Sequence, residues 1–282
     1  MTSPDQSSLR DRIVEICKRI HARGWLASTD GNVSVRLDDE RILATPTGIH
    51  KGFMSADDLI VVDRQGRKLQ GTRQPSSELR MHLAAYEERP DVRAVVHAHP
   101  TFCIVLSLAG VSLAKCLLPE TVLTFGAIPT TAYTTPTTEE VPIEIRKWVR
   151  TFDAIVLERH GSLTVGADVF DAYNKLERME HVAEITYRAR LLGPLQPLSC
   201  DQVTHLQNVA KGLGLPERKL LDSPCDSCTV CKSDGPVERQ PAPALQAAPR
   251  TLPEAQAPND EMIQRVTQAM AIALHPGTPK GR

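Results

Sequence analysis

The sequence predicts an α/β protein, with helices layered on a largely antiparallel sheet and a flexible C-terminal extension that ends in a short helix. Short apolar segments bounded by Gly, Pro or Asp mix with amphipathic segments, without the regular strand–helix repeat of a parallel sheet. The 282 residues are enough for one large domain and an appendage. Aromatic residues stop at Tyr187 although about a third of the chain follows, so the large core is expected to end near Leu192.

The first half of the main domain contains clear start and stop signals. Apolar residues three and four apart from Leu9 to Ile20 predict an amphipathic helix that ends near Gly24. Turn residues bound three expected strands, at 32–36, 41–44 and 59–62. Pro75 opens a helix that closes before Pro90, and a strand follows at 92–98.

The second half is expected to contain a helix near 102–108, a strand near 154–157 and a long helix over 168–192. We place the main domain at 1–195 and a small helical, cysteine-containing extension at 196–231. Residues 232–258 contain six Pro, six Ala and no aromatic residue, a composition that predicts a semi-extended linker. An amphipathic helix is expected at 259–275, because Met262, Val266, Met270 and Leu274 form one apolar stripe.

Composition excludes several classes of protein. The net charge is −1, with 33 Lys and Arg against 34 Asp and Glu, so no basic field is present to bind nucleic acid. Apolar runs are far shorter than the roughly 20 residues that span a bilayer, so no membrane partner is expected. The N-terminal residues lack the pattern of a secretory signal, which predicts a cytoplasmic protein.

The sharpest motif is His97-Ala98-His99 at the end of an apolar strand. Side chains at i and i+2 of a strand project from the same face, so the two imidazoles can share one ion. A second apolar strand ends at His160, where the chain turns out of the sheet. Three neutral imidazoles with an open position are a typical set of ligands for a catalytic zinc. Glu78, at the start of a helix, is the candidate fourth ligand or general base.

Three polar turns provide backbone N–H groups and hydroxyls of the kind that bind a phosphate ester. They are Thr29–Asn32, Thr45–Gly48 and the Ser76-Ser77 pair before Glu78. Nucleotide-binding glycine motifs are absent from the sequence, so the phosphate is expected to belong to a small substrate.

These motifs, in this order, resemble the class II aldolase/adducin family, most closely its fuculose-phosphate aldolase branch. The resemblance spans about Leu9 to Leu192 and rests on five segments: Gly31-Asn32-Val33-Ser34, Thr45-Pro46-Thr47-Gly48, Pro75-Ser76-Ser77-Glu78, His97-Ala98-His99 and Arg159-His160-Gly161. It implies a layered α/β/α domain that assembles as a homotetramer with an active site at each subunit interface.

The resemblance also implies site residues and an activity. Zn²⁺, one per subunit, would be bound by His97, His99 and His160, and Glu78 would be a metal ligand that becomes the acid/base when substrate displaces it. The substrate phosphate would be bound by Gly31, Asn32, Thr47, Gly48, Ser76 and Ser77. The implied reaction is the cleavage of L-fuculose 1-phosphate or L-rhamnulose 1-phosphate to dihydroxyacetone phosphate and lactaldehyde.

The sequence departs from this pattern at one position. An ungapped alignment places Leu118 where the aldolases have a tyrosine that acts on the aldehyde oxygen; Glu120 and Tyr133 are the available substitutes. Other reactions of the scaffold therefore stay open: pentulose-phosphate 4-epimerisation, dehydration of methylthioribulose phosphate and decarboxylation. A non-catalytic adducin-like binding scaffold is the alternative outside enzymes, and the three histidines argue against it.

Two features of the C-terminal third have their own interpretations. Cys225, Cys228 and Cys231 resemble part of an iron–sulfur or zinc motif, with reduced surface thiols as the alternative. The terminal helix behind a Pro/Ala linker resembles the encapsulation peptides of bacterial microcompartment cargo. That resemblance implies shell or cargo proteins as partners and a location inside such a compartment; a self-association helix is the alternative.

Overall fold

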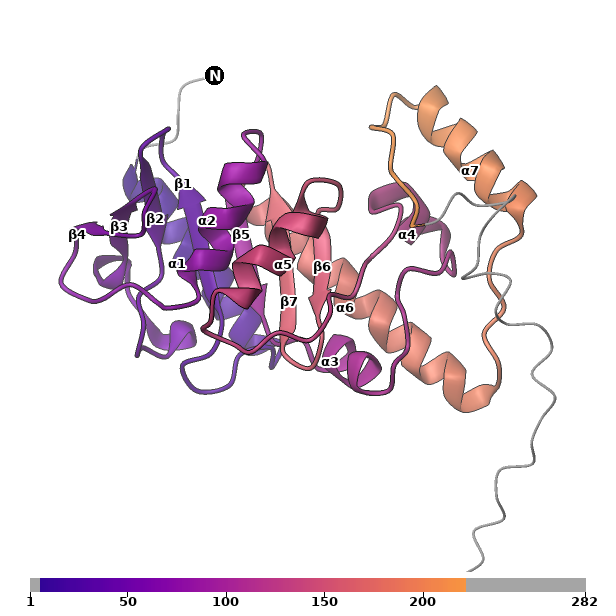
Figure 1. Cartoon of the computed structure of the whole chain (residues 1–282), viewed down its shortest axis with the longest axis horizontal. Helices are drawn as coiled ribbons and strands as arrows, with labels where there is room; N and C mark the ends of the chain where they lie inside the picture. The colour runs from indigo at the N-terminus through magenta and orange to yellow at the C-terminus, as the bar shows by residue number, and fades with distance from the viewer. Residues whose placement is uncertain (1–5, 222–282) are drawn as a thin grey trace, which may run out of the picture. The chain divides into compact units, whose positions relative to one another are not determined.

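The computed structural model describes residues 6–221, which form a seven-stranded sheet with helices on both faces (Figure 1). The strand order is β4-β3-β2-β1-β5-β7-β6, and every neighbouring pair is antiparallel. This architecture confirms the predicted layered α/β fold and its largely antiparallel sheet.

The strands are β1 (Asn32–Arg36), β2 (Arg41–Ala44), β3 (Ile60–Asp63), β4 (Lys68–Gln70), β5 (Ala94–Ala98), β6 (Ala154–Leu157) and β7 (Gly161–Gly166). The helices are α1 (Gln6–Ala22), α2 (Leu79–Glu88), α3 (Thr101–Leu108), α4 (Pro119–Thr124), α5 (Glu140–Val149), α6 (Val169–Leu192) and α7 (Cys200–Gly212). Two short 3₁₀ helices, η1 (Lys51–Phe53) and η2 (Ala56–Asp58), lie between β2 and β3.

The helix predicted to open at 75–78 begins later in the structure. Pro75 forms an isolated bridge with Pro46, and the N–H of Glu78 donates to Ser76 Oγ at 3.2 Å. These contacts keep the backbone before Glu78 out of the helix, so α2 starts at Leu79 with Glu78 as its N-cap residue. Strands β4 and β7 and helices α4 and α5 were not among the predicted elements. Strand β7 was not predicted, because it has a glycine at each end and glycine is typical of turns.

Two apolar cores lie on the two faces of the sheet. Helices α1, α3 and α6 contribute to one core and α2 and α5 to the other. The period of two in the strands divides their residues between these faces. In β1, Val33 and Val35 enter the first core, whereas Ser34 contacts α2 through His82. Polar residues are therefore buried between β1 and α2, on the face of the sheet that α2 covers.

Helices α4 and α7 lie beside each other away from the sheet, as Figure 1 shows. They share a small apolar cluster made of Cys116, Val122, Val203 and Leu220. Ser199 caps α7 through a capping box with Gln202, which explains why the helix starts there. Residues after α6 therefore pack against α4 and the segment that precedes it.

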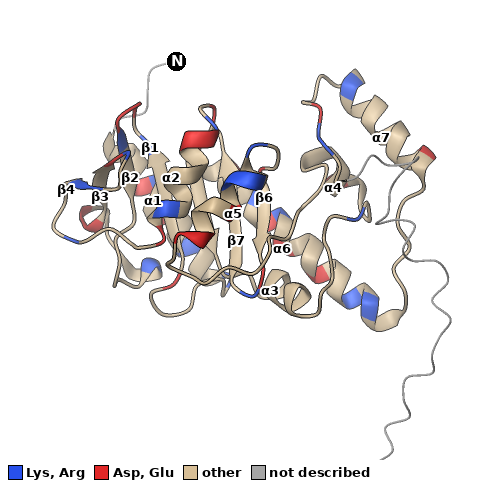
Figure 2. Ribbon diagram, in the orientation of Figure 1, with Lys and Arg blue, Asp and Glu red and all other residues tan. Residues whose placement is uncertain are grey.

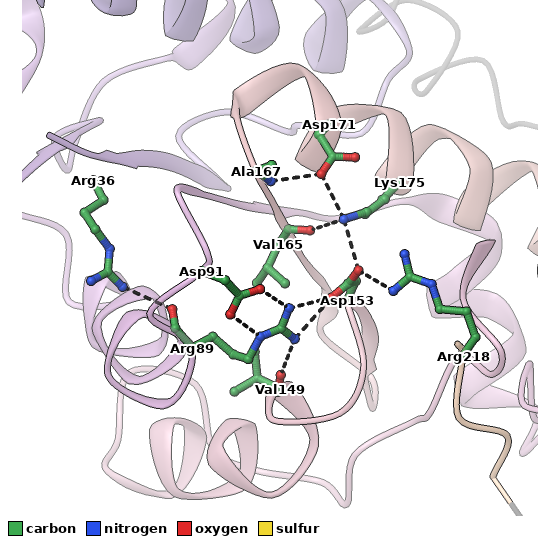
Figure 3. Close-up of polar contacts among 10 residues, drawn as sticks. All are labelled: Arg36, Arg89, Asp91, Val149, Asp153, Val165, Ala167, Asp171, Lys175 and Arg218. Atoms are coloured by element: carbon green, nitrogen blue, oxygen red, sulfur yellow. Dashed lines mark hydrogen bonds and ion pairs between the residues drawn. The ribbon is translucent and has the colours of Figure 1, made fainter. Parts of the chain in front are cut away.

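Acidic and basic residues are mixed over the same helices and loops (Figure 2), in keeping with a net charge of −1. One group of them is buried (Figure 3). Asp153, only 6% exposed, forms ion pairs with Arg89 at 3.2 Å, Lys175 at 3.1 Å and Arg218 at 2.9 Å. Arg218 comes from the segment after α7, so this ion cluster ties that segment to the sheet and α6.

Replacing Asp153 with asparagine should destabilise the protein by about 3–5 kcal/mol, because three cations lose their shared carboxylate. Burial alone raises the pKa of Asp153, but Lys175 and Arg218 outweigh it, and its pKa lies below the usual value. A lowered pKa stabilises the fold above the unfolded-state pKa of about 4, and that stability is lost as pH falls through the folded-state value. The free energy of unfolding of the wild type and of Asp153→Asn would be measured in urea at pH 7 and below pH 4. The difference between the two proteins should be smaller in acid.

The matched control is Asp91→Asn in the same ion cluster. Asp91 pairs with Arg89 at 2.7 Å but is 66% exposed, so its loss should cost less than about 1 kcal/mol. Equal effects of the two substitutions would contradict the central role given to Asp153.

Among residues 6–221, no helix is both long and apolar enough to cross a bilayer. The predicted cysteine cluster (Cys225, Cys228 and Cys231), the 232–258 linker and the 259–275 helix lie outside the described residues.

Candidate metal centre and active site

The structure brings together three histidines that the sequence separates by up to 63 positions. His97 is the fourth residue of β5, His99 follows that strand, and His160 belongs to the turn between β6 and β7. One nitrogen of each ring lies within 4.8 Å of the others. Strand β7 makes this possible, because it pairs with both β5 and β6.

Polar contacts orient two of the rings. Nδ1 of His97 donates to the carbonyl of Ser162 at 2.8 Å, and Nδ1 of His99 lies 3.4 Å from Oδ2 of Asp30. The protons of both neutral rings are thus on Nδ1, which leaves a lone pair on each Nε2. Burial, the largest cause in each case, lowers the pKa of His97 well below its usual value and also lowers the pKa of His99. Neutral imidazoles of this kind are the form that binds a metal.

The distance between these nitrogens fits a shared cation. Nε2 of His97 and Nε2 of His99 are 3.1 Å apart, so two lone pairs face each other at contact distance. Metal–nitrogen bonds of about 2.0–2.1 Å at a tetrahedral angle separate two ligand nitrogens by about 3.3 Å. His160 has a buried Nδ1 without a hydrogen-bond partner among the described residues. The donor set therefore suits a divalent cation such as zinc.

His160 is presented by a tight hairpin turn. Leu157 pairs with Gly161 across the hairpin, and Arg159 has φ of 59°, in the left-handed region. The N–H of Arg159 donates to Ser107 Oγ at 3.0 Å, which anchors the turn on α3. These contacts hold the imidazole over the end of β5.

Gly161 leaves the space that the histidine rings occupy. A Cβ there would lie 2.5 Å from the carbonyl of Ala98, 2.8 Å from Cδ2 of His99 and 3.2 Å from Cε1 of His97. Gly161→Ala is therefore expected to displace the rings and lower metal affinity about tenfold to a hundredfold, as measured by metal titration. Gly212→Ala is the control, because its Cβ meets nothing within 4 Å. Unchanged metal affinity in Gly161→Ala would contradict this account.

Glu78 lies against the histidines from the N-terminus of α2. Its Oε1 accepts from Nε2 of His160 at 3.1 Å, its Oε2 accepts from Nδ2 of Asn32 at 2.8 Å, and Oε2 is 3.7 Å from Nε2 of His97. Burial alone raises the pKa of Glu78, but the hydrogen bond from His160 and the electrostatic interaction with the nearby His97 ring outweigh it, so its pKa lies below the usual range. Glu78 is a carboxylate in this arrangement.

A buried chain of polar groups supports Glu78, and the sequence did not reveal it. Asn32, which donates to Glu78, accepts through Oδ1 from Nε2 of His82. Nδ1 of His82 lies 2.7 Å from Ser34 Oγ, which in turn lies 2.9 Å from the hydroxyl of Tyr86. Burial lowers the pKa of His82 to about 3, so this ring is neutral. The only sequence signal was the spacing of His82 four residues after Glu78, on the same face of one helix.

The predicted phosphate turns lie near one another. The Pro46–Pro75 bridge and the hydrogen bond from the Thr47 N–H to the carbonyl of Gln74, at 3.0 Å, join the second turn to the third. Asn32 links the first turn to Glu78. Thr47, Gly48 and Ser77 are exposed, Ser76 is half-buried, and Gly31 and Asn32 are buried. Both polar atoms of the Asn32 side chain are engaged, by Glu78 and His82.

Gly31 is a glycine for a steric reason. Its φ is 68°, and a Cβ would lie 2.3 Å from Leu26 Cδ2 and 2.9 Å from the carbonyl of His97. The first turn therefore packs directly on the strand that carries the metal ligand.

The residues considered as substitutes for the missing tyrosine form no hydrogen bond or ion pair with the three histidines among the described residues. Leu118 is the N-cap residue of α4, Glu120 is exposed in its first turn, and Tyr133 is 57% exposed. Within residues 6–221, no hydrogen bond or ion pair connects Glu120 or Tyr133 to the three histidines.

Comparison with known proteins adds an independent observation. Residues 11–187 match the family model described as Class II Aldolase and Adducin N-terminal domain. An L-fuculose phosphate aldolase of Methanococcus maripaludis is 33% identical over 174 residues, which cover 62% of this chain and 93% of that protein. A 3-oxo-tetronate 4-phosphate decarboxylase of Haemophilus influenzae is 32% identical over 207 residues, which cover 72% of this chain and 97% of that protein.

Solved structures show the same fold. A structure titled L-fuculose 1-phosphate aldolase superposes with a TM-score of 0.68 at 25% identity, covering 76% of this chain and all of the other. YgbL of Escherichia coli, described as a putative aldolase/epimerase/decarboxylase, superposes with a TM-score of 0.66 at 29% identity, covering 71% of this chain and 98% of the other.

Proposed function

The chain belongs to the class II aldolase and adducin family, and on that premise we propose that it is a metal-dependent lyase that cleaves a carbon–carbon bond in a phosphorylated ketose. The observation that carries this proposal is the convergence of His97, His99 and His160 with Glu78 at one end of the sheet. Relatives named as fuculose phosphate aldolases support L-fuculose 1-phosphate or L-rhamnulose 1-phosphate as substrate. The products would be dihydroxyacetone phosphate and lactaldehyde.

In this proposal His97, His99 and His160 hold one Zn²⁺ per subunit, with Glu78 next to them as a further ligand. A divalent cation in that position supplies the positive charge that stabilises the oxygen of the substrate carbonyl as the carbon–carbon bond breaks. Asp30 and the carbonyl of Ser162 keep the rings of His99 and His97 in the binding tautomer.

Glu78 carries the proton in this mechanism. Cleavage between C3 and C4 takes a proton from the C4 hydroxyl, and C3 gains one, so the reaction moves one proton in total. Glu78 is a carboxylate in this structure and must take up a proton before it gives one to C3; the C4 hydroxyl supplies it, either directly or through another group. Asn32 and His82 hold the carboxylate in position for this transfer.

The phosphate group is proposed to bind at the three adjoining turns. Their candidate donors are Gly31, Asn32, Thr47, Gly48, Ser76 and Ser77. The bridge between Pro46 and Pro75 supports this assignment, because it places two of the turns side by side.

A decarboxylase acting on a phosphorylated 3-oxo acid is the second candidate. Two observations favour it: the decarboxylase relative matches more of this chain than the aldolase relative does, and Leu118 stands where the aldolases have a tyrosine. Both reactions break a carbon–carbon bond next to a carbonyl group, so the same histidines and Glu78 serve either one.

A substrate panel distinguishes these reactions. The purified full-length protein would be offered L-fuculose 1-phosphate, L-rhamnulose 1-phosphate and 3-oxo-tetronate 4-phosphates, with coupled detection of dihydroxyacetone phosphate and of carbon dioxide. Release of dihydroxyacetone phosphate from either ketose supports the aldolase, and carbon dioxide alone supports the decarboxylase. Neither product from any substrate, together with no bound metal, would favour an adducin-like scaffold.

A homotetramer with active sites between subunits is also proposed, on the resemblance to the family. It would explain why, within residues 6–221, neither Glu120 nor Tyr133 forms a hydrogen bond or ion pair with the histidines. Light scattering of the purified protein tests the assembly, and a monomer with full activity would exclude shared sites.

Targeting to a microcompartment is proposed for residues 259–275 on the sequence pattern alone. Deleting residues 259–282 should leave the activity intact, because every proposed ligand precedes Leu192, and should abolish co-purification with shells. A truncated enzyme that still enters shells would leave self-association as the better interpretation.

A further inference from the structure

Lys51 is a buried cation that the proposed mechanism does not use. It is 3% exposed and begins the 3₁₀ helix η1, three residues after Gly48. The backbone there is held from both sides: His50 accepts from the N–H of Gly52, and a Cβ on Gly52 would lie 2.5 Å from the ring of His21 on α1. The lysine side chain is therefore directed inward by a rigid segment.

The ammonium group of Lys51 connects two of the three phosphate turns. Nζ donates to the carbonyl of Thr29, the first residue of the turn that leads to Gly31 and Asn32. The lysine itself lies three residues after Gly48, the last residue of the Thr45–Gly48 turn. One residue thus links two of the turns proposed to bind the anion.

The charge of Lys51 is not balanced by an ion pair within residues 6–221. The carbonyl of Thr29 accepts from one of the three N–H donors of the Lys51 ammonium group. Burial, the largest cause, lowers the pKa of Lys51, while Cys17, Glu78 and Asp30 act in the opposite direction. Buried charges in proteins are normally paired, so a group with this environment points to an anion that binds from outside the chain.

The proposed phosphate donors show why a cation is needed. Gly31, Asn32, Thr47, Gly48, Ser76 and Ser77 are all uncharged. A phosphate monoester carries a charge of about −1.5 to −2 at neutral pH. Neutral donors alone leave most of that charge uncompensated, whereas a lysine ammonium contributes a charge-assisted hydrogen bond.

We propose that Lys51 is the cation that binds the phosphate group of the substrate at the junction of the Thr29–Asn32 and Thr45–Gly48 turns. This inference rests on the proposed function, because it assumes a phosphorylated substrate at those turns. It makes Lys51 a determinant of specificity for phosphorylated over unphosphorylated sugars.

Binding of inorganic phosphate to the full-length protein tests the proposal without depending on the reaction. Lys51→Met keeps most of the aliphatic side chain and removes the charge, so it should weaken phosphate binding by about tenfold to a hundredfold in isothermal titration. Lys18→Met is the matched control: Lys18 is exposed on α1, and its variant should bind phosphate like the wild type. Metal content and thermal unfolding would be measured for each protein.

A second measurement needs no variant. A crystal structure of the wild-type protein with bound phosphate should place a phosphate oxygen within hydrogen-bond distance of Lys51 Nζ. An anion bound at the turns but away from Nζ would overturn the proposal, as would a folded Lys51→Met protein with wild-type phosphate affinity.

Activity measurements separate this inference from the proposed function. Lys51→Met should raise KM for the phosphorylated substrate more than it lowers kcat, and it should leave kcat/KM for an unphosphorylated analogue nearly unchanged. An equal loss with both substrates would overturn the role of Lys51 while the lyase assignment stands. No lyase activity in the wild type, with phosphate binding lost in Lys51→Met, would overturn the proposed reaction and support Lys51.

Discussion

Replacing Glu78 with glutamine is expected to lower turnover by about a hundredfold to ten-thousandfold while the metal stays bound. The side chain should keep its place, because one amide atom still accepts from Nδ2 of Asn32, where Oε2 now does at 2.8 Å. The amide nitrogen then faces Nε2 of His160, which can accept from it after a change of tautomer. The variant therefore retains the position of Glu78 and loses its ability to carry a proton.

Initial rates with the substrate found by the panel, together with metal analysis of the same sample, check this result. Glu40→Gln is the control, since Glu40 is exposed in the turn at the far end of β1 from Asn32. Near-normal rates in Glu78→Gln would show that another group transfers the proton.

Replacing His97 or His160 with alanine is expected to reduce metal affinity by more than about a hundredfold and to abolish activity. Removing a residue that only hydrogen-bonds to a metal ligand lowers metal affinity by about tenfold to a hundredfold. Here the ligand itself is removed, so the loss should be larger. Two imidazoles and a carboxylate would remain, one protein ligand fewer than the proposed intact site. Metal titration against a competing chelator measures the loss.

His160→Ala is the cleaner of the two variants. His97 is fully buried and donates to the carbonyl of Ser162, so its removal also takes a buried hydrogen bond from the core. His160 is 10% exposed, and its removal takes one hydrogen bond from Glu78, which keeps the bond from Asn32, so thermal unfolding should change less than in His97→Ala. His205→Ala, at an exposed position of α7, is the control. Full metal content in His160→Ala would remove this histidine from the proposed site.

Much of the fold could be predicted because local patterns report local geometry. Strands β1 and β2 begin and end where turn residues predicted them, β6 has its predicted limits, and α3 and α6 lie within a residue of theirs. Strand β7 was missed, since Gly161 and Gly166 bound a segment of only six residues. Glycine at its start is required by the rings of His97 and His99, which belong to another strand and cannot be seen in the local sequence.

The candidate site could be predicted in part for the same reason. His97 and His99 are two residues apart, and the alternation of a strand is enough to bring them together. Lys51, in a short 3₁₀ helix, carried no local signal. His82 offered only its spacing from Glu78, because a histidine on the buried face of α2 resembles any core residue in the sequence. Their proposed roles follow from hydrogen bonds to Thr29 and Asn32, which lie in other parts of the fold.

The sequence by itself determined the class of fold, the limits of most strands and helices, and the residues able to bind a metal, because each depends on residue type and short-range periodicity. Only the tertiary structure decided which of them meet. His160 reaches His97 because β7 pairs with both β5 and β6, and Glu78 reaches the histidines because α2 packs across β1 with its N-terminus at the same end of the sheet. Contacts between residues 46 to 82 positions apart arise from the packing of the whole domain, which no local pattern encodes.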